Sequence, residues 1–380
     1  MPSTPTPLHA LHAAGQSIWL DFIDRAMLGT GELERQIREL ALTGMTSNPT
    51  IFEKALATGT AYDAQLRAAA AAGTRDPWAL FELVETDDVR TACDAFAGVY
   101  AASGRQDGYV SIEVSPGSAH DAEATIVEAH RLWRTVDRPN VMIKVPGTVE
   151  GCVALRRLIA DGMNVNVTLL FAVAAHDRVI EAYLAGLEDR AAAGGDLAGV
   201  ASVASFFVSR VDGAIDPMLE AMVQAGTLPR ERATALQGRA AIANAQRAYQ
   251  LFQSRFKGPR WEALAARGAQ VQRPLWASTS TKNPAYRDVL YVEQLIGPHT
   301  VNTMPPATFD AFRDHGVTAR TVDADPAAAD AVLAELAALG ISLDAVTDRL
   351  LADGLLSFQK SFDSLIAGIA AKTAALDAAS

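Results

Sequence analysis

Residues 141–168 read VMIKVPGTVEGCVALRRLIADGMNVNVT, and the fold prediction starts from the pattern within them. Short runs of apolar and β-branched residues stand at both ends, at 141–145 and 164–168, and such runs are typical of buried strands. The residues between them have the composition of a helix. A strand, a helix and another strand in this order predict two parallel strands joined by a helical crossover.

The same alternation continues on both sides of this segment. Further strands are expected at 17–21, 42–46, 109–114, 200–207, 274–277 and 300–303. Together with the two strands above they make eight, the number at which a parallel sheet closes into a barrel. We therefore predict an α/β fold of the (β/α)8 TIM-barrel type.

Two connections are longer than one β/α unit requires, and both have helical periodicity. They span 51–107 and 207–273, and neither contains a composition shift or a low-complexity linker. We predict additional helices in these connections, a C-terminal helical segment after the barrel, and a single domain over residues 1–380.

Helix boundaries are predicted at three places. Asn48-Pro49 and Asn283-Pro284 predict helix starts, because Asn is a favoured N-cap residue and Pro suits the first helical position. In the C-terminal segment, apolar residues recur at helical spacing, which predicts an amphipathic helix or two helices broken at Gly354. These residues are Leu343, Val346, Leu350, Phe358, Phe362, Leu365 and Ile369. We expect them to pack on the barrel wall, with a subunit interface as the alternative.

The composition argues against several classes of protein. With 49% hydrophobic and 20% charged residues, the chain is not mainly disordered. Its formal net charge of -11 argues against nucleic acid and anionic membranes as partners, because both attract clustered cations. Neither a signal peptide nor a run long enough to span a membrane is evident. The two cysteines suggest neither a disulfide framework nor a zinc site, so a cytoplasmic location is expected.

Lys144 is the residue with the clearest chemical prediction. Side chains alternate across a strand, so Lys144 faces one side while Ile143 and Val145 face the other. A lysine near the C-terminal end of a barrel strand points into the mouth, where barrel enzymes hold their active sites. Loss of hydration there favours the neutral amine, which attacks carbonyl carbons. The alternative is a lysine with a buried stem and a hydrated head.

Polar residues near the ends of other strands favour the catalytic interpretation. Asp21 closes one strand, Glu113 has the opposite parity to its apolar neighbours, and Asn164, Asn166 and Thr168 share one face of another strand. Burying so many polar groups without partners would be costly, so they predict a wet, hydrogen-bonded cavity. A purely structural polar network is the alternative.

An amine with two carboxylates nearby suits cleavage of a C–C bond beside a carbonyl. The amine condenses with a ketone, and the resulting iminium accepts the electron pair of the breaking bond. A carboxylate takes the proton from the hydroxyl whose carbon becomes an aldehyde. Asp21 and Glu113 also favour the charged ammonium, which opposes the effect of desolvation, and both influences remain open at this point.

Two later segments are candidates for binding phosphate. Ser205 and Arg210 end a strand, and a guanidinium can bind phosphate through two hydrogen bonds. The alternative for Arg210 is a surface ion pair with Asp212 or another acid. In the segment ASTSTK, Ser278 and Lys282 precede an expected helix start, where hydroxyls, amides and a helix N-terminus converge.

Seven motifs in this order resemble the transaldolase family in its longer bacterial form. They are SIWLD, TSNPTIF, VSIEVSP, IKVPGT, NVNVTLLF, SFFVSRVD and LWASTSTKNPAY. The resemblance implies a transferase of the pentose phosphate pathway that acts on sugar phosphates without cofactor or metal. It would move a dihydroxyacetone unit from sedoheptulose 7-phosphate to glyceraldehyde 3-phosphate, giving erythrose 4-phosphate and fructose 6-phosphate.

The resemblance also implies a role for each matching residue. Lys144 is expected to form the Schiff base and Asp21 to exchange the proton of the substrate C4 hydroxyl. Glu113 and Thr168 resemble a pair that holds a catalytic water. Contacts with the substrate are implied for Asn48, Asn166, Ser205, Arg210 and Ser278. Many shorter relatives have SPFVGR and ASFR where this chain has SFFVSR and ASTS. The second phosphate-binding cation therefore has no direct counterpart, and Lys282 is the expected replacement.

Several alternatives remain beside this prediction. A fructose 6-phosphate aldolase-like lyase would use the same lysine but release free dihydroxyacetone. A metal-dependent barrel lyase would need converging histidines and carboxylates, and the seven histidines are scattered along the sequence. A non-catalytic barrel and a pyridoxal phosphate enzyme are the remaining alternatives. A homodimer is an additional expectation.

Overall fold

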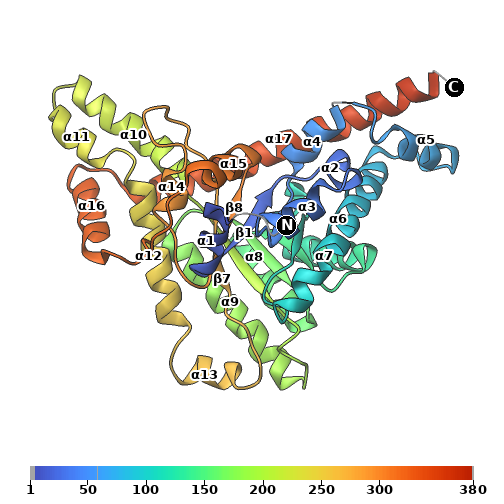
Figure 1. Cartoon of the computed structure of the whole chain (residues 1–380), viewed down its shortest axis with the longest axis horizontal. Helices are drawn as coiled ribbons and strands as arrows, with labels where there is room; N and C mark the ends of the chain where they lie inside the picture. The colour runs from blue at the N-terminus through green and yellow to red at the C-terminus, as the bar shows by residue number, and fades with distance from the viewer. Residues whose placement is uncertain (1–4, 58, 379–380) are drawn as a thin grey trace.

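The computed structural model describes residues 5–57 and 59–378 and contains a closed barrel of parallel strands (Figure 1). Its strands follow one another around the barrel in sequence order, and the last pairs with the first. They are β1 (Gln16–Asp21), β2 (Gly44–Thr46), β3 (Val110–Glu113), β4 (Val141–Pro146), β5 (Val165–Leu170), β6 (Ser202–Phe207), β7 (Arg273–Ala277) and β8 (Thr300–Met304). The predicted barrel is confirmed, and no strand end differs from its prediction by more than two residues.

The strands were recognisable in the sequence because helices cover the outer face of the sheet, which makes each strand a nearly continuous apolar run. Strands β4, β5 and β6 are buried along their whole length, as parallel strands with both faces covered should be. Their register also arranges the chemistry: Glu113 pairs with Lys144, and Lys144 with Asn166. Three polar residues therefore form a row across β3, β4 and β5.

The two long connections contain additional helices, as predicted. The second holds α4 (Pro49–Ala57), α5 (Asp63–Ala71) and α6 (Pro77–Ala102), and the sixth holds α10 (Ser209–Gln224), α11 (Arg230–Leu236), α12 (Ala240–Arg255) and α13 (Pro259–Ala265). The other α-helices before the C-terminal one in the described residues are α1 (Pro7–Ala13), α2 (Arg25–Gly29), α3 (Glu32–Glu39), α7 (Ala122–Val136), α8 (Val149–Asp161), α9 (Val173–Ala192), α14 (Leu290–Glu293), α15 (Pro306–His315) and α16 (Pro326–Ala338). In the described part of the chain, every helix is too short or too polar to cross a membrane.

The C-terminal segment is one continuous helix, α17 (Leu343–Ala378), so the first of the two predicted forms is confirmed and the break at Gly354 is not present. Its predicted place on the barrel wall is wrong. The helix packs against α4, α6 and α10, and its course beside α4 is seen in Figure 1. Phe358 lines the cavity at the barrel mouth. Gly354 marks a close approach: a Cβ there would lie 3.1 Å from Cδ2 of Leu169 on β5. The missing side chain therefore serves packing across the mouth.

The two Asn-Pro pairs have different structures. Asn48 accepts a hydrogen bond from the backbone three residues later, and α4 begins at Pro49 as predicted. Asn283-Pro284 begins no helix, so that prediction is wrong. The side-chain oxygen of Asn283 accepts from the backbone of Ala285 at 3.0 Å, and the hydroxyl of Tyr286 donates to Asp216 on α10 at 2.5 Å.

Candidate active site

A cavity of about 260 Å³ lies at the carboxyl ends of the barrel strands. Eight of the ten predicted site residues line it: Asp21, Asn48, Lys144, Thr168, Ser205, Arg210, Ser278 and Lys282. The other two, Glu113 and Asn166, are bonded to residues of the cavity wall. The structure thus brings together side chains from residues 21 to 282 at the end of the barrel where catalytic sites are built.

Lys144 is buried beside a carboxylate. Its Nζ donates to Oε2 of Glu113 at 3.0 Å and to the backbone oxygen of Ser47 at 3.1 Å. Lys144 is 5% exposed and Glu113 is 9% exposed. Burial raises the pKa of Glu113, and the nearby Lys144 ammonium opposes this rise. The amine therefore has a carboxyl group within direct proton-transfer distance.

Asp21 lies at the end of β1 and is fixed by a neighbouring hydroxyl. Thr46 Oγ1 donates to Asp21 Oδ1 at 2.8 Å and lies 2.7 Å from Thr303 Oγ1. Burial raises the pKa of Asp21, while the charges of Lys144 and Arg210 and the Thr46 hydrogen bond oppose the rise. A buried carboxyl with a raised pKa is suited to taking and returning a proton during a reaction.

Thr168 lies beside an irregularity in β5, while its own pairing with Pro146 on β4 keeps the regular register. The register with β6 shifts between Val167 and Leu170, and Leu169 has a φ of 60°, in the left-handed region. Such bulges re-aim side chains near active sites. The buried Thr168 hydroxyl has no hydrogen-bond partner among the described residues. Since buried hydroxyls normally have partners, this one is available to a water or a substrate.

Asn166 is held at both ends of its amide group. Its Nδ2 donates to Ser111 Oγ at 3.0 Å, and its Oδ1 accepts from Ser205 Oγ at 2.6 Å. Asn48, in contrast, uses its side-chain oxygen to cap α4. Ser111, Asn166 and Ser205 thus form a hydrogen-bonded chain beside the cavity, and neither Asn164 nor Thr168 of the predicted face joins it.

Arg210 faces the cavity and forms no ion pair with Asp212 or another described acid, so the predicted alternative for this residue is wrong. Its guanidinium lies 5.1 Å from the ring centroid of Phe207. Asp212 instead accepts hydrogen bonds from the backbone of Ala241 at 2.8 Å and the hydroxyl of Tyr291 at 2.9 Å. Burial lowers the pKa of Arg210, and the charge of Asp21 opposes this shift. The guanidinium is therefore directed toward a ligand site.

The segment after β7 contributes hydroxyls and a second cation. Ser278 has a φ of 55°, and its Oγ lies 3.0 Å from Ser209 Oγ at the start of α10. Lys282 donates to Ser280 Oγ at 2.9 Å. The predicted helix N-terminus is absent here, so side chains and the strained turn at Ser278 form this side of the cavity.

The sequence predictions did not include ten of the lining residues, and Lys54 and Phe358 are two of these. Lys54 on α4 is a further cation, and Phe358 on α17 lies with its ring centroid 5.8 Å from Lys144 Nζ. The motif around Asn48 was a signal for Lys54, because it predicted a helix starting at the mouth. Phe358 had no comparable signal, since an apolar position on a helix does not reveal what the helix covers.

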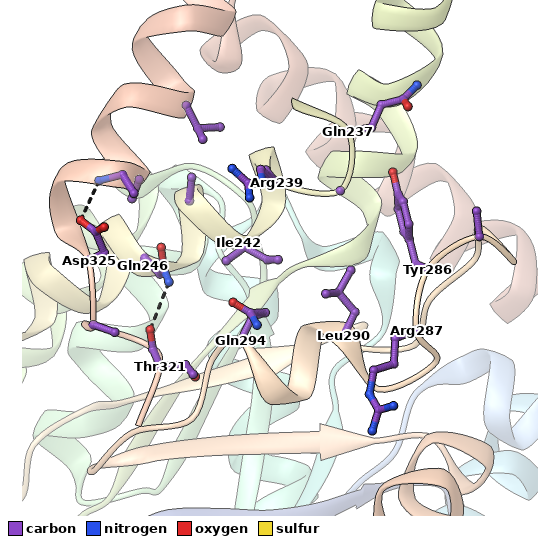
Figure 2. Close-up of a pocket in the computed structure, with 17 residues that line it drawn as sticks. Gln237, Arg239, Ile242, Gln246, Tyr286, Arg287, Leu290, Gln294, Thr321 and Asp325 are labelled. Atoms are coloured by element: carbon purple, nitrogen blue, oxygen red, sulfur yellow. Dashed lines mark hydrogen bonds between the residues drawn. The ribbon is translucent and has the colours of Figure 1, made fainter. Parts of the chain in front are cut away.

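A larger cavity, of about 550 Å³, lies between α12, α14 and α16 and contains none of the ten predicted residues (Figure 2). Ile242 and Leu290 form part of its apolar lining, with Arg239 and Gln246 among the polar groups. Its wall has no lysine that could attack a carbonyl group. Size alone therefore does not identify the reactive site.

The histidines do not gather in the catalytic cavity. None of the seven lines it, and His176 is buried in α9, where burial lowers its pKa to about 4. Within residues 5–57 and 59–378, no group of three or more His, Cys, Asp or Glu side chains is arranged to hold a metal ion.

A family model and the similar proteins all indicate the same family. A family model described as transaldolase/fructose-6-phosphate aldolase matches residues 18–369. The chain is 49% identical over 360 residues to a transaldolase of Mycolicibacterium smegmatis, covering 94% of this chain and 95% of that protein. It is 47% identical over 365 residues to a transaldolase of Frankia alni, covering 96% of each. It is also 48% identical over 368 residues to transaldolase 1 of Streptomyces coelicolor, covering 97% and 95%.

Proposed function

The chain belongs to the transaldolase/fructose-6-phosphate aldolase family, and from this premise we propose that it transfers a dihydroxyacetone unit between sugar phosphates through a Schiff base on Lys144. The observation that carries the proposal is the pairing of the buried Lys144 with Glu113 at 3.0 Å, inside a cavity that also contains Asp21 and several cations. An amine, two carboxyl groups and cations are the groups that this reaction needs.

In the first half of the reaction, the enzyme cleaves a ketose phosphate. Glu113 takes a proton from Lys144, whose amine attacks the C2 carbonyl, and loss of water gives the iminium. Asp21 then takes the proton of the C4 hydroxyl while the C3–C4 bond breaks. The electron pair of that bond moves toward the iminium and leaves an enamine on Lys144. The aldehyde formed from C4 departs, as erythrose 4-phosphate from sedoheptulose 7-phosphate.

In the second half, the enamine is transferred to another aldehyde. Its C3 attacks the carbonyl carbon of glyceraldehyde 3-phosphate, and Asp21 returns the proton to the new C4 hydroxyl. Water then hydrolyses the iminium and releases fructose 6-phosphate. Glu113 and Thr168 hold this water, and the unpartnered hydroxyl of Thr168 supports that role.

The substrate phosphates bind the cations at the rim of the cavity, and Arg210 makes the main contact. Arg210→Ala should raise the KM for phosphorylated aldehydes roughly 10- to 100-fold, because a hydrogen bond to a charged group contributes about 1.5–3 kcal/mol. The KM for unphosphorylated glyceraldehyde should change little. Steady-state kinetics with glyceraldehyde and glyceraldehyde 3-phosphate measure this difference.

Matched variants identify the second cation. Lys282→Ala and Lys54→Ala are compared in the same assay. The lysine whose replacement abolishes the preference for the phosphorylated aldehyde is the one that makes the second phosphate contact. Arg349→Ala is the control, because Arg349 on α17 is 83% exposed and does not line the cavity. If Arg210→Ala raised the KM for both aldehydes equally, Arg210 would not be the residue that binds the phosphate.

A transfer assay tests the function as a whole. Fructose 6-phosphate is incubated with and without erythrose 4-phosphate, and sedoheptulose 7-phosphate and free dihydroxyacetone are measured. We expect sedoheptulose 7-phosphate to form only with the acceptor and little dihydroxyacetone to appear. Dihydroxyacetone release that is equally fast without acceptor would favour the aldolase alternative, and the absence of both products would contradict the proposal.

The proposal also includes a cytoplasmic location, a homodimer and one domain over residues 1–380. Free thiols at Cys93 and Cys152 support a reducing compartment. The contribution of Phe358 to the cavity supports a single domain, since α17 and the barrel share one site. Light scattering in solution measures the number of subunits.

A further inference from the structure

Among the described residues, Phe358 is the one through which α17 contributes to the lining of the catalytic cavity. It is 7% exposed, and the centroid of its ring lies 5.8 Å from Nζ of Lys144. Asp21 and Thr168 line the same cavity. The ring is therefore next to the atom on which every covalent intermediate of the proposed reaction forms.

Packing on both sides of Phe358 keeps the ring in this position. One turn earlier, Gly354 allows α17 to approach Leu169 and Arg210, since a Cβ at this glycine would lie 3.1 Å from Cδ2 of Leu169 and 3.6 Å from Nη1 of Arg210. One turn later, Phe362 packs against Trp78, with ring centroids 4.8 Å apart. Positions four residues apart share a helix face, so all three contacts belong to one face of α17.

A polar contact joins the same part of α17 to the helix on the other side of the mouth. Thr50 Oγ1 on α4 donates to Ser361 Oγ at 2.8 Å. Since α4 starts at the end of β2, this bond ties α17 to the rim of the barrel. Phe358 is thus a packed part of the cavity wall rather than a side chain at a loose helix end.

The enamine on Lys144 has two possible fates, and water decides between them. If C3 attacks an acceptor aldehyde, a new C–C bond forms and the unit is transferred. If C3 takes a proton from water instead, a second water hydrolyses the resulting iminium. This step releases free dihydroxyacetone and regenerates the lysine amine. Excluding water from a closed site suppresses such side reactions.

We propose that Phe358 determines the specificity of this site for transfer over release, because its ring keeps water from the enamine carbon on Lys144. An aromatic ring offers no exchangeable proton and occupies space that water would fill. Its π face also attracts the cationic iminium, since the ring lies within the usual 6 Å of a cation–π contact. This inference rests on the proposed function and concerns only the fate of its intermediate.

The test measures how the enamine divides between transfer to the acceptor and release as dihydroxyacetone in variants of Phe358. With fructose 6-phosphate and erythrose 4-phosphate, Phe358→Ala should raise the ratio of free dihydroxyacetone to sedoheptulose 7-phosphate by roughly tenfold, because water enters the space of the ring. Phe358→Leu keeps an apolar cover and should stay close to the wild-type ratio. Phe358→Gln is similar in length but polar, and should release dihydroxyacetone as the Ala variant does.

Two controls keep this test distinct from the test of the function. Leu356→Ala changes a 61% exposed residue of the same helix and should leave the ratio unchanged. Borohydride trapping on Lys144 shows that each variant still forms the imine. Folded Ala and Gln variants that form the adduct but keep the wild-type ratio would overturn the role of Phe358. A wild-type protein with neither adduct nor transfer would instead overturn the proposed function.

Discussion

Lys144→Arg should abolish turnover and prevent any covalent dihydroxyacetone adduct after reduction with borohydride. Arginine keeps the positive charge beside Glu113, but its guanidinium stays protonated and forms no imine. The loss of the nucleophile should lower kcat by at least about 10⁴-fold, the scale on which catalytic nucleophiles act in other enzymes. Trapping with fructose 6-phosphate, followed by intact mass measurement and peptide mapping, gives the result.

A second lysine of the cavity provides the matched control. Lys282→Arg makes the same chemical change at a residue that lines the cavity but lies on its exposed rim. This variant should still give the adduct on the peptide that contains Lys144. An adduct that persists in Lys144→Arg, or that maps to another peptide, would show that the Schiff base forms elsewhere.

Asp21→Asn should separate imine formation from C–C cleavage. The amide can keep the hydrogen bond from Thr46 at 2.8 Å, but it cannot take the proton of the C4 hydroxyl. Loss of a general base typically costs 10²- to 10⁴-fold, so we expect cleavage to slow by roughly that factor. Borohydride should then trap the intact six-carbon sugar phosphate on Lys144, whereas the wild-type protein gives the three-carbon adduct.

Another buried aspartate controls for the loss of a carboxylate. Asp212→Asn alters a residue that is bonded to Tyr291 and the backbone of Ala241 and does not line the cavity. Its adduct should remain the three-carbon one, and melting midpoints show whether either variant is unfolded. If Asp21→Asn gives the three-carbon adduct at the wild-type rate, another group removes the C4 proton.

The barrel and most of the catalytic cavity could be predicted from local patterns. Strands buried on both faces appear as short apolar runs, and this signal does not depend on distant parts of the chain. The alternation of side chains then assigns polar residues such as Lys144 and Glu113 to one face near the strand ends. Because parallel strands in a closed barrel all end at the same mouth, these side chains converge there.

The wrong predictions all concern contacts between distant parts of the chain. Asn283-Pro284 has the local features of a helix start, but no helix begins there, and the nearby Tyr286 is hydrogen-bonded to the distant Asp216. Asp212 is close to Arg210 in sequence, yet its hydrogen bonds are with residues of α12 and α14. In both cases the observed partners are ones that the local sequence does not reveal.

The C-terminal helix shows where information from sequence ends. Its apolar period indicated correctly that one face is buried, but periodicity is the same whether that face covers a barrel wall or a barrel mouth. Only the folded chain places Gly354 against Leu169 and Phe358 beside Lys144. Backbone pattern and strand order are local properties, whereas the surface that a helix covers depends on the packing of the whole molecule.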